Sequence, residues 1–202
     1  MNVGIFGGSF NPPHIAHLVV AESIRDQFDM DSILWIPGYI PPHKTHLRLV
    51  DAEHRMEMTK LAISSNPNFD ISAIEIERKG VSFTVDTLRT LTEQTPDINY
   101  HLVIGEDSLY DFMTWRQPAE ILSMVKLLVY RRPGKHQLSP DTPAEVYIQF
   151  PDRILFADAP LLEVSSASIR NHLARGKSIR HLVPNNVYDY IYEHGLYDVN
   201  NG

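Results

Sequence analysis

The sequence contains no cysteine, so disulfide bonds and thiolate chemistry are excluded and the redox compartment stays open. No apolar run approaches the ~18 residues of a membrane-spanning helix, and residues 1–6 lack the basic start of a secretory signal. Cations are also in the minority, with 18 Lys and Arg against 25 Asp and Glu. The resulting net charge of −7 argues against non-specific electrostatic binding to nucleic acid or to an anionic membrane. We therefore expect a cytoplasmic protein with neither partner.

Several motifs of common enzyme classes are absent as well. The dinucleotide fingerprint G-x-G-x-x-G does not occur. Gly176-Lys177-Ser178 has the tail of a Walker A motif, but Asn171 stands where its first glycine is required. Neither a G-x-S-x-G elbow nor an H-E-x-x-H helix is found. These absences weaken interpretations as a hydride-transfer enzyme, a P-loop protein, a serine hydrolase or a zinc protease.

Short apolar runs alternate with segments of helical periodicity, and 43% hydrophobic residues suffice for a core. The predicted strands cover residues 1–6, 32–38, 70–76, 99–105, 126–132 and 153–158. The predicted helices cover residues 15–28, 52–64, 84–95 and 118–124. This alternation predicts an α/β fold of the Rossmann-like, doubly wound type, with a mostly parallel sheet and helices on both faces. Ligands of such sheets bind beyond the carboxyl ends of the strands.

We expect one domain over residues 1–202, whose C-terminal part, residues 166–197, is helical throughout. Pro184 is expected to open the last helix, and Gly195 to close it. Asp51 is a plausible N-cap of the second helix. The segment 133–152 is predicted to be irregular, and the oligomeric state stays open.

The most informative stretch is GGSFNPPHIAH, residues 7–17, here called the signature loop. Gly7 and Gly8 allow a ligand close to the backbone, and the following helix start favours an anion. His14 and His17 are three residues apart and lie on one side of the first helical turn. The loop therefore predicts a phosphate site with two titratable donors. A zinc site would need further ligands, such as His43 or His46.

The signature loop resembles that of nucleotidyltransferases with the H-x-G-H motif. Further segments resemble, in order, the bacterial nicotinate-nucleotide adenylyltransferase family: IPPHK (40–44), KGVSFTVDTL (79–88), IGEDSL (104–109), TWRQPAEIL (114–122), RRPG (131–134), VSSASIR (164–170) and LVPNNVYDYIYEHGLY (182–197). The resemblance implies transfer of the adenylyl group of ATP to nicotinate mononucleotide, releasing pyrophosphate. It also implies Mg²⁺, held mainly by the ATP phosphates.

The resemblance further implies a role for individual residues. It makes His14 and His17 catalytic. It assigns ATP binding to Gly7, Gly8, Ser9, Phe10, Lys44, Gly105, Asp107, Ser165, Ser166 and Arg170, and mononucleotide binding to Thr84, Trp115 and Arg132. Structural alternatives stay open, because a serine or aspartate before a helix is often an N-cap and a tryptophan is often a core residue.

The chain departs from the family pattern at three positions. Ala16 replaces a glycine, Ala167 replaces a threonine, and Arg116 replaces an aromatic residue. Arg116 bears on the preference for the acid over the amide of the mononucleotide. Two alternatives therefore stay open: a related transferase acting on nicotinamide mononucleotide or another phosphate acceptor, and a nucleotide-binding sensor without turnover.

Overall fold

The computed structural model describes residues 1–40, 49–130 and 145–198. They contain a six-stranded parallel sheet in the order β3-β2-β1-β4-β5-β6. The strands are β1 (Asn2–Gly8), β2 (Ser32–Pro37), β3 (Phe69–Ile71), β4 (Asn99–Gly105), β5 (Lys126–Tyr130) and β6 (Ile154–Ala157). The strand order reverses between β1 and β4, which is the ligand-binding position of doubly wound sheets. The predicted fold class is confirmed.

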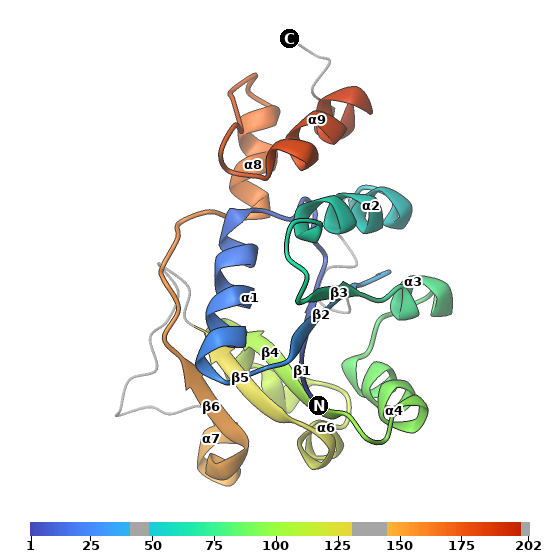
Figure 1. The fold of residues 1–202 in the computed structure, drawn as a ribbon, viewed down its shortest axis with the longest axis vertical. Helices are drawn as coiled ribbons and strands as arrows, with labels where there is room; N and C mark the ends of the chain where they lie inside the picture. Colours follow the sequence, from blue (N-terminus) through green and yellow to red (C-terminus); the bar gives the residue numbers. More distant parts are fainter. Residues whose placement is uncertain (41–48, 131–144, 199–202) are drawn as a thin grey trace.

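Helices cover both faces of the sheet (Figure 1). One face packs against α1 (Ile15–Gln27), α2 (Ala52–Ile63), α8 (Ser166–Leu173) and α9 (Asn185–Glu193). The other packs against α4 (Thr84–Gln94), α5 (Glu106–Tyr110), α6 (Pro118–Met124) and α7 (Glu145–Gln149). Short 3₁₀ turns occur at Phe112–Thr114, Pro151–Arg153 and Leu196–Asp198. In Figure 1, α8 and α9 (orange and red) lie together with α2 at one end of the molecule.

Successive side chains of each strand alternate between two hydrophobic cores, one on each face of the sheet. Ile5 in β1 belongs to the core under α4 to α7, whereas its neighbour Phe6 belongs to the core under α1, α2, α8 and α9. Leu102 and Val103 in β4 divide in the same way. Successive side chains of a strand point to opposite faces, so a sheet covered on both faces needs continuous apolar runs. This is why the strands were recognisable in the sequence.

The predicted strand over residues 70–76 is wrong in its second half. β3 ends at Ile71, and Ile74–Arg78 forms the helix α3. The backbone N–H of Ser72 still donates to Trp35 O, but β2 ends two residues later at Pro37, so the ladder has no further partner. The Ser72 hydroxyl then accepts from the N–H of Ile74 and starts the turn into α3.

The C-terminal part is not helical throughout, contrary to expectation. Residues 174–184 separate α8 from α9, and Gly176 lies in the left-handed region at φ +61°. Pro184 is the residue before α9, and Gly195 follows its end at φ +57°, as expected. The segment 133–152 is likewise not irregular throughout, since residues 145–149 form α7. Residues 133–144 of that segment lie outside the described residues.

Candidate active site

The signature loop leaves the carboxyl end of β1 at the point where the strand order reverses. Gly7 is exposed, and a Cβ built on it would meet nothing within 4 Å, so its backbone is open to a ligand. Gly8 serves packing instead, because an added Cβ would lie 2.9 Å from the Phe10 ring. Phe10 is buried at φ +43°, a left-handed conformation that strains a bulky residue. Backbone strain of this kind is typical of functional sites.

His14 and His17 lie against each other at the start of α1. Their ring centroids are 3.6 Å apart with 25° between the planes. The His14 backbone N–H donates to Nδ1 of His17 over 3.2 Å. Nδ1 is therefore an acceptor in this contact, so in the neutral ring the proton is on Nε2 of His17. The first turn of α1 adds the positive end of the helix dipole.

A buried arginine that the sequence interpretation missed holds the signature loop. Arg55, in α2, is 1% exposed and donates to four backbone carbonyls. The acceptors are Val50 O (2.9 Å), Ser9 O (3.0 Å), Gly38 O (2.5 Å) and Tyr39 O (2.9 Å). Burial lowers the pKa of the Arg55 guanidinium, and Tyr197, Glu53 and Asp51 partly oppose that effect. Arg55 thus fixes the backbone at Ser9, next to the strained Phe10, to the chain that follows β2.

Asn11 and Tyr197 support the loop from the C-terminal side. The Tyr197 hydroxyl donates to Asn11 Oδ1 over 2.8 Å, and the Val50 N–H donates to the same oxygen over 3.3 Å. Burial raises the pKa of the Tyr197 hydroxyl well above its usual value, although Arg170 and Arg55 lower it in part. Tyr197 is therefore a neutral donor in the working pH range. The sequence interpretation assigned no role to Asn11 or Tyr197.

The last motif, VSSASIR, meets the signature loop directly. Ser165 is the N-cap of α8, and its hydroxyl accepts from the N–H of Ser168 over 3.1 Å. Ser166 Oγ donates to Pro12 O over 2.8 Å, and Arg170 Nη1 donates to Asn11 O over 2.7 Å. The structural interpretation therefore holds for Ser165. The other two side chains join α8 to the part of the signature loop that precedes α1.

The motif IGEDSL ends β4, the neighbour of β1 at the reversal of strand order. Gly105 is buried as the last residue of β4, and Asp107 lies in the first turn of α5. Both are thus at the carboxyl edge of the sheet, as expected. The residue between them, Glu106, is 1% exposed and was not predicted to have a role.

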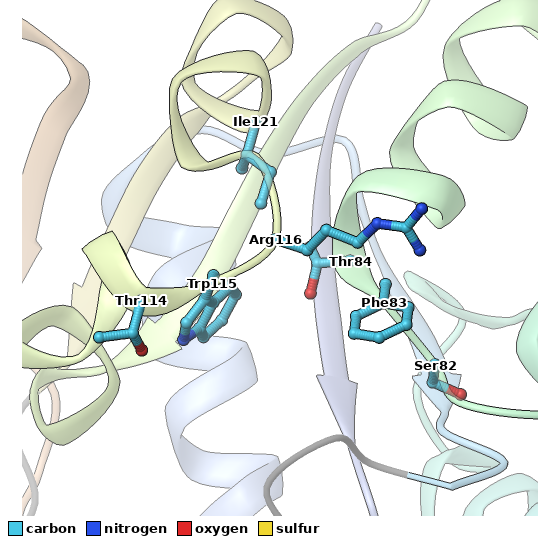
Figure 2. Close-up of a pocket in the computed structure, with 7 residues that line it drawn as sticks. All are labelled: Ser82, Phe83, Thr84, Thr114, Trp115, Arg116 and Ile121. Atoms are coloured by element: carbon cyan, nitrogen blue, oxygen red, sulfur yellow. The ribbon is translucent and has the colours of Figure 1, made fainter.

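A cavity of about 150 Å³ lies beside this edge, and we call it the aromatic pocket. It is lined by Ser82, Phe83, Thr84, Thr114, Trp115, Arg116 and Ile121. Figure 2 shows Trp115 on one side and Phe83 on the other. The adjacent residues Gly38 and Tyr39 connect the pocket to the signature loop. The Gly38 N–H donates to Gly8 O in the loop (2.9 Å), and the Tyr39 N–H donates to Ser82 Oγ in the pocket wall (2.9 Å).

The pocket walls offer an aromatic face and a helix N-terminus. Trp115 is half-buried and packs against Phe112, with ring centroids 5.1 Å apart. Thr84 begins α4, whose N-cap position is Phe83 and carries no side-chain cap. The Arg116 guanidinium lies 4.8 Å from the centre of the Phe83 ring. An aromatic ring carrying a negative group is the kind of ligand that suits these walls.

Two predicted site residues, Lys44 and Arg132, lie outside the described residues, as do His43 and His46. Within the described ranges, no group of three or more His, Cys, Asp or Glu side chains is arranged to hold a metal ion. No described helix combines the length and apolarity required to cross a membrane.

Comparisons with known proteins match this chain over nearly its whole length. A family model described as cytidylyltransferase-like matches residues 5–172. The probable nicotinate-nucleotide adenylyltransferase of Salinibacter ruber is 46% identical over 197 residues, 98% of each chain. The nicotinate-nucleotide adenylyltransferase of Bacillus subtilis is 38% identical over 196 residues, 97% of this chain and 98% of that one.

A solved structure shares the fold. Nicotinic acid mononucleotide adenylyltransferase of Plasmodium falciparum, complexed with NaAD, superposes with a TM-score of 0.79. The match covers 100% of this chain and 99% of that chain at 20% identity. At that identity the likeness is evidence for the fold alone.

Proposed function

This chain belongs to the nicotinate-nucleotide adenylyltransferase family within the cytidylyltransferase-like proteins, and from that premise we propose that it transfers the adenylyl group of ATP to nicotinate mononucleotide. The products are nicotinate adenine dinucleotide and pyrophosphate, so the reaction belongs to NAD biosynthesis. The observation that carries the proposal is a phosphate-type loop joined by hydrogen bonds to an aromatic pocket at one sheet edge. That arrangement suits two substrates whose phosphates must meet.

The proposed reaction needs positioning more than proton transfer. An ionised oxygen of the mononucleotide 5′-phosphate attacks the α-phosphorus of ATP and forms a P–O bond. The bond from the α-phosphorus to the oxygen bridging to the β-phosphate breaks, and pyrophosphate leaves with that electron pair. The nucleophile is already deprotonated at pH 7, so no general base is required. Catalysis then rests on orientation and charge stabilisation.

The ATP half of the site is the signature loop with α8. We assign to His14 and His17 the stabilisation of charge that develops on the α-phosphate, with His17 Nε2 as the proposed donor because its Nδ1 accepts from the His14 backbone. Gly7, Gly8, Ser9 and Phe10 would contribute backbone contacts. Arg170 and the N-terminus of α8 would contact the outer phosphates, with Lys44 as a further cation. Gly105, at the end of β4, and Asp107, in the first turn of α5, would contact the nucleotide.

The mononucleotide half of the site is the aromatic pocket. A pyridinium ring stacks favourably on the electron-rich face of Trp115. The N-terminus of α4 at Thr84 favours a carboxylate over a neutral amide, because it carries a partial positive charge. We therefore favour the nicotinate form over the nicotinamide form as the acceptor. We also propose Arg132, which lies outside the described residues, for mononucleotide binding.

Mg²⁺ would be held mainly by phosphate oxygens of ATP and by water, since it prefers oxygen ligands and retains much of its hydration. The signature loop offers imidazole nitrogens and backbone N–H groups, which suit an anion. These donors fit a metal that arrives with the triphosphate. When bound, the ion supplies positive charge to the triphosphate.

Pyrophosphate release tests the proposal. The purified protein is incubated with ATP and Mg²⁺, and nicotinate mononucleotide, nicotinamide mononucleotide and other phosphate acceptors are offered in turn. We expect the fastest release with the nicotinate form. Faster release with the nicotinamide form would overturn the assigned acceptor, and no release with any acceptor would overturn the transferase activity. ATP binding without release of pyrophosphate would instead support the alternative of a nucleotide-binding sensor without turnover.

A further inference from the structure

The two walls of the aromatic pocket come from separate segments of the chain. Residues 82–84 lead into α4, whereas residues 114–116 lead into α6. A ring inserted between Trp115 and the Phe83–Thr84 wall requires a fixed spacing between these segments. Contacts that join α4 to α6 would set this spacing.

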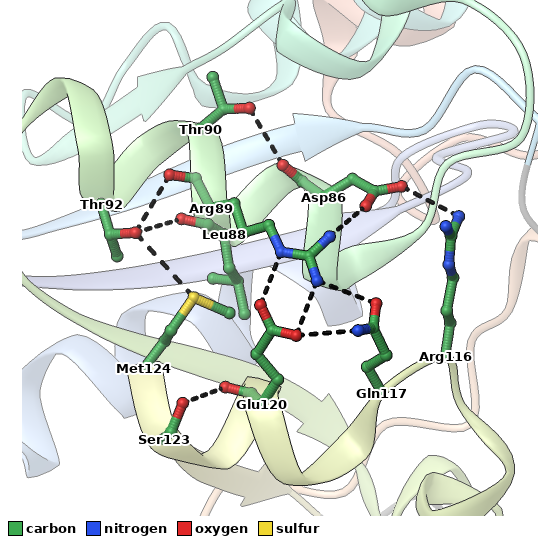
Figure 3. Close-up of polar contacts among 10 residues, drawn as sticks. All are labelled: Asp86, Leu88, Arg89, Thr90, Thr92, Arg116, Gln117, Glu120, Ser123 and Met124. Atoms are coloured by element: carbon green, nitrogen blue, oxygen red, sulfur yellow. Dashed lines mark hydrogen bonds and ion pairs between the residues drawn. The ribbon is translucent and has the colours of Figure 1, made fainter.

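Arg89, in α4, makes those contacts (Figure 3). Its Nε donates to Glu120 Oε1 over 2.6 Å, and its Nη2 donates to Glu120 Oε2 over 2.7 Å. Nη2 also donates to Gln117 Oε1 over 2.9 Å, while Nη1 donates to Asp86 Oδ1 over 3.0 Å. The two parallel bonds to one carboxylate are the fork geometry that a guanidinium holds best.

The network continues into the pocket wall. Asp86 Oδ2 accepts from Arg116 Nη1 over 3.4 Å, and the Arg116 guanidinium covers the Phe83 ring. Gln117, which follows Arg116, lies in the left-handed region at φ +54°. Its side chain bonds both Arg89 and Glu120. The strained turn that directs the chain from Trp115 into α6 is thus held through Arg89.

The charges of the network balance, with two arginines facing two carboxylates. It therefore adds little net field to the pocket, and its contribution is geometric. The hydrogen bonds from Arg89 lower the pKa of Glu120, and those to Glu120 raise the pKa of Arg89. Both groups stay charged over the range in which an enzyme of this kind would work.

We propose that Arg89 is a positioning residue that sets the spacing of the pocket walls and so the affinity for the pyridine end of the mononucleotide. The inference rests on the proposed function, because it concerns the acceptor half of that site. Arg89 does not line the pocket, and it acts through Gln117, Asp86 and Arg116. None of these contacts involves a residue of the signature loop.

The test compares Arg89→Met with Arg25→Met as a matched control. Arg25 makes a similar half-exposed ion pair with Glu22, three residues away on α1, and is outside both halves of the site. We expect R89M to raise the Kd for nicotinate mononucleotide, measured by calorimetry, by about three- to tenfold. The KM for the mononucleotide should rise equally, with kcat and the KM for ATP within about twofold of wild type. R89K keeps the positive charge but lacks the two-pronged guanidinium, so its Kd for the mononucleotide should lie between those of wild type and R89M.

Unchanged mononucleotide affinity in R89M would overturn the inference, as would an equal rise in both KM values or an equal effect of R25M. The calorimetric result decides the inference even if the wild-type protein releases no pyrophosphate, an outcome that would overturn the proposed function alone. Failure of the wild-type protein to bind the mononucleotide would overturn both.

Discussion

Two arginines hold the two halves of this site, and they do so in opposite ways. Arg55 is 1% exposed and bonds four backbone carbonyls from residues 9, 38, 39 and 50. Arg89 is 35% exposed and bonds side chains, chiefly the carboxylates of Glu120 and Asp86. One arginine fixes backbone in the interior, and the other joins two helices at the surface.

The difference follows from what each half has to hold. The signature loop carries a strained turn at Phe10, and a carbonyl left without a donor in the interior costs about 1–3 kcal/mol. A buried anchor can therefore hold the loop rigidly. Under the proposed function the pocket walls must admit and release a ring, and half-exposed ion pairs are individually weak and screened by salt. We expect ATP-side geometry to be rigid and acceptor-side geometry to be more adjustable.

The largest effect should come from His17→Ala, which removes the proposed charge-stabilising donor from the rigid half. Loss of one such donor costs about 3 kcal/mol of barrier, so kcat should fall by about a hundredfold or more. Steady-state kinetics measure the loss, and circular dichroism checks that the fold is intact. His194→Ala, at the exposed C-terminal end of α9, is the control and should leave kcat unchanged. A near-normal rate in H17A would refute the role of His17.

Arg55→Met should show the largest effect on stability, because it leaves one buried and three partly buried carbonyls without their donor. We expect a loss of about 3 kcal/mol or more in the free energy of unfolding, measured by urea denaturation. Arg25→Met, which removes a surface ion pair, should cost less than about 1 kcal/mol. Equal losses in the two variants would remove the contrast between a buried anchor and a surface pair.

Tyr197→Phe tests the rigid, signature-loop half of the site through the pH dependence of protein stability. Burial raises the folded-state pKa of Tyr197 above its unfolded value near 10, so its contribution is complete below about pH 10 and is lost as pH rises toward the folded pKa. Y197F should cost about 1 kcal/mol at neutral pH through the lost bond to Asn11, and its stability should fall less steeply above pH 10. Urea titrations on both sides of pH 10 measure this. Identical pH profiles for Y197F and the wild type would contradict this prediction. Tyr147→Phe, at an exposed tyrosine, is the control.

Local patterns predicted most of the fold, and the exceptions have physical reasons. The buried strands were visible because both faces of the sheet are covered. Residues 74–76 alternate like a strand yet form a helix, because their neighbour β2 had already ended at Pro37. No local pattern reports where a neighbouring strand stops.

In the candidate site, too, local sequence patterns predicted some features, and others appear only in the folded structure. The spacing of His14 and His17 predicted adjacent rings, and the structure stacks them. Arg55 left one signal, a lone arginine on the apolar stripe of a predicted helix, which is unusual enough to mark a buried anchor. The pairs Asn11–Tyr197 and Arg89–Glu120 join segments far apart in the chain, so only the folded arrangement reveals them.

The most direct test of the central claim follows the α-phosphate of ATP. The protein is given ATP labelled at that phosphorus, together with nicotinate mononucleotide and Mg²⁺. We expect the label to move into a dinucleotide in step with unlabelled pyrophosphate. Label that stays in ATP, or that leaves as AMP without dinucleotide, would contradict adenylyl transfer.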